Sequence, residues 1–165
     1  MAVRSRETAS RLLGDMSRKF GTGQKTVKIG FFADATYPDG TSVPMVAAIN
    51  EFGAPSRGQP PRPFFRRMIA AKSGGWREAM QKNLGATNYD ADATLDRVGA
   101  GIAGQLQLSI RDLVEPPLKQ STIDAKGFSK PLIDTAVLVN ACSWQVSDGP
   151  IRRIETQIPS PRAKK

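Results

Sequence analysis

Residues 46–64 have the sequence VAAINEFGAPSRGQPPRPF and join two predicted helices through a loop rich in proline, glycine and arginine. Gly53 stands where a helix commonly ends in a left-handed conformation. The prolines and glycines of residues 54–63 restrict the path of the loop, and Phe52 and Phe64 anchor its two ends. An exposed connection restricted in this way is typical of a surface that another molecule contacts, and it contains no catalytic group.

Glu51 lies near the C-terminus of the first of these helices, where the helix dipole disfavours a negative charge. We therefore expect an ion pair, with Arg62 or Arg66 as the nearest supplier of the cation. A single acid beside arginines, without a second acid or a nucleophile, forms no acid–base pair. The pattern thus favours a structural role for Glu51.

Hydrophobic periodicity outward from this stretch predicts an α+β fold of one domain over residues 1–165. Helical spacing predicts helices over residues 5–20, 44–52, 63–84 with an interruption at 73–75, 90–114 and a short one at 137–139. Alternation of apolar and polar residues predicts strands over residues 26–32, 141–146 and 151–158. We expect a small antiparallel sheet packed against a few helices, with flexible basic arms at 1–6 and 159–165 and an extended loop at 54–63.

The predicted helix over residues 90–114 carries one continuous apolar stripe with steps of three and four residues: Leu95, Val98, Ile102, Leu106, Ile110 and Leu113. Gly99, Gly101 and Gly104 lie inside it at a cost in stability, so we expect them to mark close packing against another helix. Other predicted core positions are Phe65, Met68, Ile69, Trp76, Met80 and Leu84.

The composition argues against an enzyme. The 165 residues include no histidine and one cysteine, so a metal site or a serine triad has no ordinary ligand or base. Cys142 follows an apolar stretch and is predicted to be a small core residue, and a lone cysteine indicates a reducing compartment such as the cytosol. We expect no cofactor, no bound metal and no membrane span.

The net charge of +9 and the pI near 10.1 have two open interpretations. One is solubility with basic tails; the other is an acidic partner, either nucleic acid or the acidic face of a neighbouring protein. The candidate residues for contact with DNA or an acidic partner are Arg57, Arg67, Arg162, Lys164 and Lys165.

The order of three short segments resembles a known family. They are I-N-E-F-G with the preceding Ala48, R-P-F at residues 62–64, and K-P-L-I-D-T-x-x-L-x-N at residues 130–140. The chain resembles the neck and tail-completion proteins of long-tailed double-stranded DNA bacteriophages from about Val27 to Val146. It departs from the family pattern at Ala136, where similar sequences usually have glycine.

The resemblance implies a non-enzymatic virion protein, assembled in the host cytoplasm, that forms a ring at the head–tail junction. A hexamer or dodecamer is expected, beside a head–tail adaptor, tail terminator or tube, with genomic DNA passing through without sequence-specific reading. We expect residues 54–63 at a subunit boundary, with Glu51, Phe52, Gly53, Arg57, Arg62, Phe64 and Arg66 as contact residues. Phe52 and Phe64 are equally compatible with a core position.

The alternative is a small basic nucleic-acid-binding protein that uses residues 57–67 and the C-terminal tail. Salt dependence separates the two, because phosphate contacts weaken steeply with salt whereas apolar subunit contacts persist.

Overall fold

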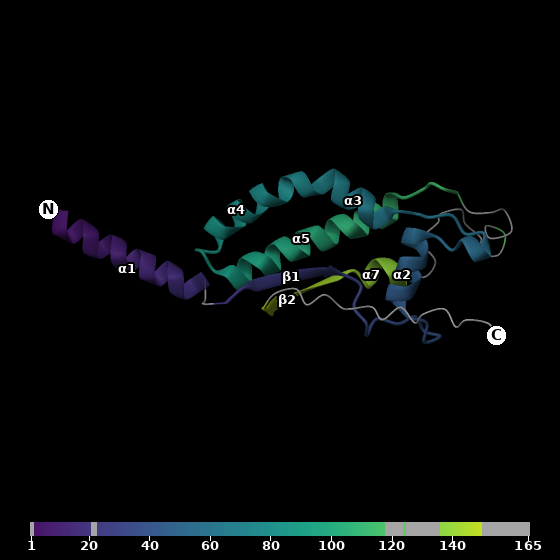
Figure 1. Ribbon diagram of the computed structural model, residues 1–165, viewed down its shortest axis with the longest axis horizontal. Helices are drawn as coiled ribbons and strands as arrows, with labels where there is room; N and C mark the ends of the chain where they lie inside the picture. Colours follow the sequence, from purple (N-terminus) through teal and green to yellow (C-terminus); the bar gives the residue numbers. More distant parts are fainter. Residues whose placement is uncertain (1, 21–22, 118–123, 125–135, 150–165) are drawn as a thin grey trace, which may run out of the picture.

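The computed structural model describes residues 2–20, 23–117, 124 and 136–149. Its elements, in chain order, are α1 (Ala2–Phe20), β1 (Lys25–Gly30), α2 (Val43–Phe52), the short 3₁₀ helix η1 (Pro55–Arg57), α3 (Phe64–Lys72), the 3₁₀ turn η2 (Ser73–Gly75), α4 (Trp76–Ala86), α5 (Ala91–Asp112), α7 (Val137–Asn140) and β2 (Ser143–Asp148). The predicted α+β class is confirmed, with the longest helix of the body at α5 (Figure 1). The predicted strand at 151–158 lies outside the described residues.

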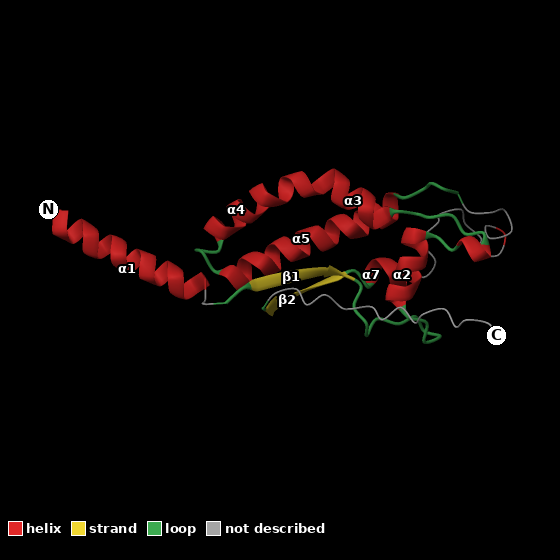
Figure 2. Cartoon of the chain, viewed as in Figure 1, coloured by secondary structure: helices red, strands yellow, loops and turns green. Residues whose placement is uncertain are grey.

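α5 is the central element of the body. One side of it packs against α3 and α4, and the other packs against the two-stranded sheet (Figure 2). The predicted stripe forms the core along α5, with Leu95 half-buried and the other five residues buried. The rest of the described core cluster is formed by Val43 and Ala47 of α2, Phe64 and Met68 of α3, and Leu138, Val139 and Cys142.

One predicted core position on α3 is wrong. Ile69 is exposed, whereas the predicted Met68 is buried and the predicted Phe65 is half-buried against the core, next to the buried Phe64. The predicted interruption is confirmed, because η2 separates α3 from α4 and lets both helices follow α5. A helix packed along a single neighbour turns only one narrow face inward, so a shift of one residue moves a side chain out of the core.

β1 and β2 pair antiparallel in a register that places Val27 opposite Val146. Gly99 of α5 lies against this sheet: a Cβ there would be 2.7 Å from Trp144 Cδ1 and 2.8 Å from Val27 Cγ2. The expectation that the α5 glycines mark a helix–helix contact is therefore corrected. Gly99 allows the helix to approach the sheet, and a Cβ at Gly101 or Gly104 would meet nothing within 4 Å.

Polar side chains fix the ends of these elements. The carboxylate of Asp90 accepts a hydrogen bond from the Ala93 N–H at 2.9 Å and caps α5. Lys25 Nζ lies 2.8 Å from Asp92 and 3.0 Å from Asp148, so it links the starts of β1 and α5 to the end of β2. Hydrogen bonds to the two carboxylates raise the pKa of Lys25.

α7 begins at a residue with an unusual backbone. Ala136 has φ 59°, in the left-handed region that glycine favours. This is the position at which the resemblance leads us to expect glycine, so the alanine keeps the geometry and bears its steric cost. Asp134 and Thr135, which precede this residue and are candidate caps by residue type, lie outside the described residues.

α1 begins at Ala2, so residues 2–6, expected to be an arm, are helical. Figure 1 shows α1 extending away from the body beyond the start of β1. Among the described residues, none of the closely packed pairs of elements includes α1. Residues 159–165 lie outside the described part of the chain.

Candidate functional site

The two ends of the proline-rich loop are joined through the carboxylate of Glu51. Its side chain, on the last turn of α2, is only 7 % exposed. One carboxylate oxygen accepts from the Phe65 N–H at 2.9 Å, and the other accepts from the Arg66 N–H at 3.1 Å and from Arg66 Nε at 2.8 Å. The carboxylate therefore caps α3, whose N-cap residue Pro63 makes no side-chain capping bond.

The expected ion pair of Glu51 is thus confirmed, with Arg66 as the partner. Arg66 also donates from Nη2 to the Glu51 carbonyl oxygen at 2.9 Å. That carbonyl belongs to the end of α2, where carbonyl groups have no partner within the helix. One arginine therefore serves both the side chain and the backbone of Glu51.

Arg62, the other expected partner, has a different role. Its buried guanidinium donates to the carbonyl oxygens of Pro116 and Pro117 at 3.2 and 3.3 Å. Its backbone N–H donates to the Asn50 carbonyl at 2.6 Å. Burial lowers the pKa of Arg62. Arg62 thus ties the segment that leaves α5 to the end of the loop.

The loop between these anchors is held by its own hydrogen bonds. The Ala54 N–H donates to the Gln59 carbonyl at 2.9 Å, and Gln59 Nε2 donates to Asn50 Oδ1 at 3.1 Å. Gly53 caps α2 with φ 79°, and a Cβ there would lie 2.8 Å from Pro61 N. The predicted restriction of the loop is therefore present in the structure, and it requires glycine at 53.

The structure separates the predicted contact residues into two groups. Glu51, Arg62 and Phe64 are buried within the chain, and Phe64 belongs to the core. Buried side chains offer no surface to a neighbour, so these three residues support the site instead of contacting a partner. Gly53 is half-buried, and its role is the turn itself.

Phe52, Arg57 and Arg66 are the predicted contact residues that face outward. Phe52 is 66 % exposed, and the guanidinium carbon of Arg66 lies 5.1 Å from the centre of its ring. The open choice for the two phenylalanines is thereby decided: Phe64 is a core residue and Phe52 is a surface residue.

An apolar groove lies beside Phe52, and we call it the α2 groove. Its volume is about 280 Å³, and it is lined by Phe31, Pro44, Ala47, Ala48, Glu51, Phe52, Phe64, Phe65 and Arg66. We did not predict this groove from the sequence. A signal was present, because Pro44, Ala48 and Phe52 follow one another at four-residue steps along one side of α2, and all three line the groove.

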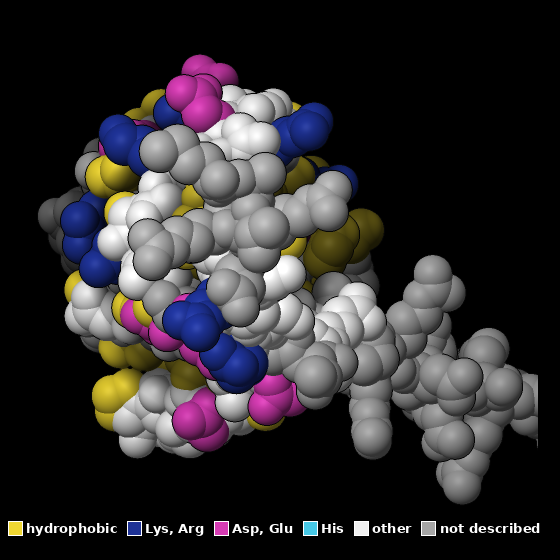
Figure 3. Space-filling model, turned by 90° about the vertical axis from the view of Figure 1, so that its left-hand side faces the viewer, with side chains coloured by type: hydrophobic (Ala, Val, Ile, Leu, Met, Phe, Trp, Pro, Cys, Tyr) yellow, Lys and Arg dark blue, Asp and Glu magenta, His cyan; other side chains and the backbone are white. Residues whose placement is uncertain are grey.

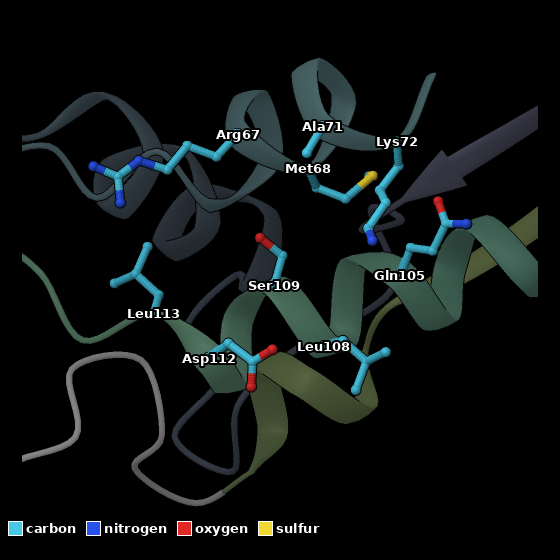
Figure 4. Close-up of a pocket in the computed structure, with 9 residues that line it drawn as sticks. All are labelled: Arg67, Met68, Ala71, Lys72, Gln105, Leu108, Ser109, Asp112 and Leu113. Carbon is cyan, nitrogen blue, oxygen red and sulfur yellow. The ribbon is translucent and has the colours of Figure 1, made fainter. Parts of the chain in front are cut away.

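A second hollow of about 410 Å³ lies between α3 and α5 (Figure 4). Met68 of α3 and Ser109 of α5 lie between the two helices, and Arg67, Lys72 and Asp112 bring charges of both signs to its lining. The Ser109 hydroxyl donates to the Phe64 carbonyl at 2.7 Å, so it fastens α5 to the start of α3.

Of the residues predicted to meet DNA or an acidic partner, Arg57 and Arg67 are exposed. Arg162, Lys164 and Lys165 lie outside the described residues. Seen from the end of the molecule that carries α1, Lys and Arg side chains are interspersed with Asp and Glu side chains (Figure 3). Within the described ranges, no group of three or more cysteine, aspartate or glutamate residues could hold a metal ion.

No family model, curated protein or solved structure matches this chain. None of the described helices has the length and apolar character needed to cross a membrane.

Proposed function

We propose that this chain is a non-enzymatic virion protein of a tailed bacteriophage that forms part of a ring at the head–tail junction. The proposal places it at the neck or at the tail-completion position, with DNA passing through the ring. Its basis is the resemblance of three short segments together with the way in which two of them meet in space.

The observation that carries the proposal is the joint between I-N-E-F-G and R-P-F. These segments are separated by the loop, yet Glu51 of the first caps the helix that follows the second. Gly53 and Arg62 serve the same joint from either side of the loop. The residues that carry the resemblance therefore cooperate in one structural unit, as a shared architectural motif would.

The surface of this unit suits a subunit contact. Phe52 and Arg57 are exposed on a backbone that hydrogen bonds hold in place, and Arg66 covers one side of the Phe52 ring. A contact made by preformed groups loses little conformational entropy on binding. Aromatic and arginine side chains are also enriched where subunits bind tightly.

The rival function is nucleic-acid binding through exposed arginines. The net charge of +9 and the exposure of Arg57 and Arg67 favour it. The end of the molecule that carries α1 shows both signs of charge instead of a basic field, so that end does not serve the rival function (Figure 3). An electrostatic footprint for DNA concentrates lysine and arginine on one face.

The test is cryo-electron microscopy of phage particles produced by the genome that encodes this chain. We expect density for the chain as a symmetric ring between capsid and tail, with residues 54–63 at a boundary between subunits. The paired variant Phe52→Asp with Arg57→Glu should yield unjoined heads and tails. A variant at exposed Glu78 of α4, Glu78→Gln, serves as the control and should assemble normally.

The opposite result is equally definite. Absence of the chain from finished particles, together with DNA binding by the purified protein that weakens steeply with salt, would overturn the neck assignment. It would favour the nucleic-acid-binding function instead.

A further inference from the structure

α1 presents an apolar face that the described body does not cover. Leu12 and Leu13 are 62 % and 65 % exposed, and Met16 follows Leu12 by one helical turn on the same side. The charged Arg11, Asp15 and Arg18 lie on other sides of the helix, and Arg18 pairs with Asp15. Helices in proteins gain most of their stability from packing of an apolar face, so this face of α1 needs a partner.

The same chain carries an uncovered acceptor for such a face. The α2 groove is apolar over most of its lining, and two of its lining residues, Ala48 and Phe52, belong to the exposed stripe Met45, Ala48 and Phe52 on α2. Ala48 is the smallest of the three and sits between the larger two, which permits close approach of a second helix. A cavity of about 150 Å³ holds one benzene molecule. The groove, at about 280 Å³, therefore has room for two leucine-sized side chains.

The two surfaces lie at opposite ends of the molecule. α1 joins the body at Lys25, the first residue of β1, whereas Phe31 of the groove follows the last residue of that strand (Figure 1). A strand of six residues separates the two points by about 20 Å. The four residues 21–24 span at most about 14 Å, so α1 reaches its own groove only by folding back along the sheet.

The path of such a fold-back is unfavourable for an apolar helix face. Val27 and Trp144 point toward α5, so their neighbours Lys28 and Gln145 point to the other face of the sheet. Both are exposed and polar, and Ser143 at the end of β2 is exposed as well. The leucines of α1 would lie against these groups and remain without apolar contacts.

We propose that α1 of one copy of this chain docks into the α2 groove of a second copy, with Leu12, Leu13 and Met16 covering Ala48 and Phe52. This contact is heterologous, because donor and acceptor are different surfaces, and repetition of a heterologous contact builds a ring or an open filament. The inference rests on the proposed function only for closure into a ring, and it names the surfaces by which neighbouring subunits join.

Disulfide trapping tests the contact in the purified full-length protein. Leu12→Cys and Ala48→Cys are made in separate chains of different tag length, mixed at high concentration and oxidised gently. The mixed adduct is expected several-fold above the yield obtained when Leu12→Cys is mixed with Glu78→Cys, whose cysteine lies on exposed α4. Cys142 stays in place, because it is buried.

Three results would overturn the proposal. The first is a mixed adduct no more abundant than the one formed with the Glu78→Cys control. The second is disulfide formation only between two Leu12→Cys chains. The third is an intrachain disulfide in a double variant that carries both Leu12→Cys and Ala48→Cys. The last result would mean that α1 folds back onto its own groove.

A solution measurement gives an independent readout from the acceptor side. Ala48→Glu places a charge in the groove on an exposed residue, so the body keeps its fold, and sedimentation should show a several-fold loss of self-association. Arg11→Glu, on the polar side of α1, is the matched control and should sediment like the unmodified chain. Self-association unchanged by Ala48→Glu contradicts the docking.

These results are separable from the proposed function. A chain found in the neck of the particle but without the Leu12–Ala48 adduct would overturn the docking and leave the neck assignment standing. If the Leu12–Ala48 adduct forms but the chain is absent from particles, the docking stands and the neck assignment is overturned.

Discussion

Arg66 Nε lies 2.8 Å from Glu51 Oε1, and through this pair the end of α2 is fastened to the start of α3. The two side chains differ in exposure, at 57 % for Arg66 and 7 % for Glu51. The buried carboxylate also receives two backbone N–H groups of α3, so most of its stabilising effect comes from capping. The exposed arginine contributes less, because water screens it.

Glu51→Gln should therefore destabilise the fold more than Arg66→Met. An amide has one acceptor oxygen for the three donors that now share the carboxylate, and the loss is expected to be about 1–3 kcal/mol. Arg66→Met should cost about 1 kcal/mol or less, as exposed ion pairs do. Urea unfolding followed by tryptophan fluorescence measures both. Equal losses in the two variants would contradict the capping role.

Gly99 is the residue at which α5 can least accept a side chain. Gly99→Ala would place a Cβ 2.7 Å from Trp144 Cδ1, and separating the helix from the sheet should cost roughly 1–3 kcal/mol. Gly101→Ala is the matched control on the same helix. A Cβ there meets nothing within 4 Å, and alanine should stabilise the helix by about 0.5–1 kcal/mol. Thermal unfolding should move in opposite directions for the two variants.

Ala136→Gly should stabilise the protein. The backbone at 136 has φ 59°, which strains an L-residue and costs glycine nothing. Part of the gain is offset by the greater freedom of glycine in the unfolded chain, so a net gain of about 0.5–1 kcal/mol is expected. Ala136→Val should act in the opposite direction, because a branched side chain fits this backbone worst. A loss of stability with glycine would show that another conformation is preferred at 136.

Cys142 should resist thiol reagents while the chain is folded. Burial raises the pKa of its thiol from 9.0 to about 12, so the reactive thiolate is suppressed. Mass spectrometry after brief alkylation at neutral pH should show an unmodified chain, with rapid modification once denaturant unfolds it. Fast modification of the folded chain would contradict the burial of this residue.

The Cys142 thiol also makes the free energy of unfolding depend on pH in the alkaline range. Its folded pKa lies above its unfolded pKa, so its contribution is fully present below about pH 9 and is lost as the pH rises toward about 12. Other groups titrate in this range, and comparison with Cys142→Ala isolates the thiol. The difference in unfolding free energy between the two chains should shrink across this interval. A constant difference would contradict the shift.

Local patterns along the chain were sufficient for the elements themselves. The apolar spacing from Leu95 to Leu113 predicted α5, the run Ser73–Gly75 predicted the break between α3 and α4, and Gly53 was predicted to end α2. Periodicity and backbone preference act between residues close in sequence, so they are readable without a structure. For the same reason, the candidate ion-pair partners of Glu51 could be limited to Arg62 and Arg66.

Only the tertiary structure decided which groups meet. It directed Arg66 to Glu51 and Arg62 to the carbonyls of Pro116 and Pro117, and it placed Gly99 against Trp144 instead of another helix. It also left the apolar side of α2 and that of α1 exposed at opposite ends of the molecule. A sequence pattern reports that a face is apolar or that a position must be small, because those are properties of one segment. Which surface covers that face depends on the relative positions of segments distant in the chain, and only the packed fold sets those positions.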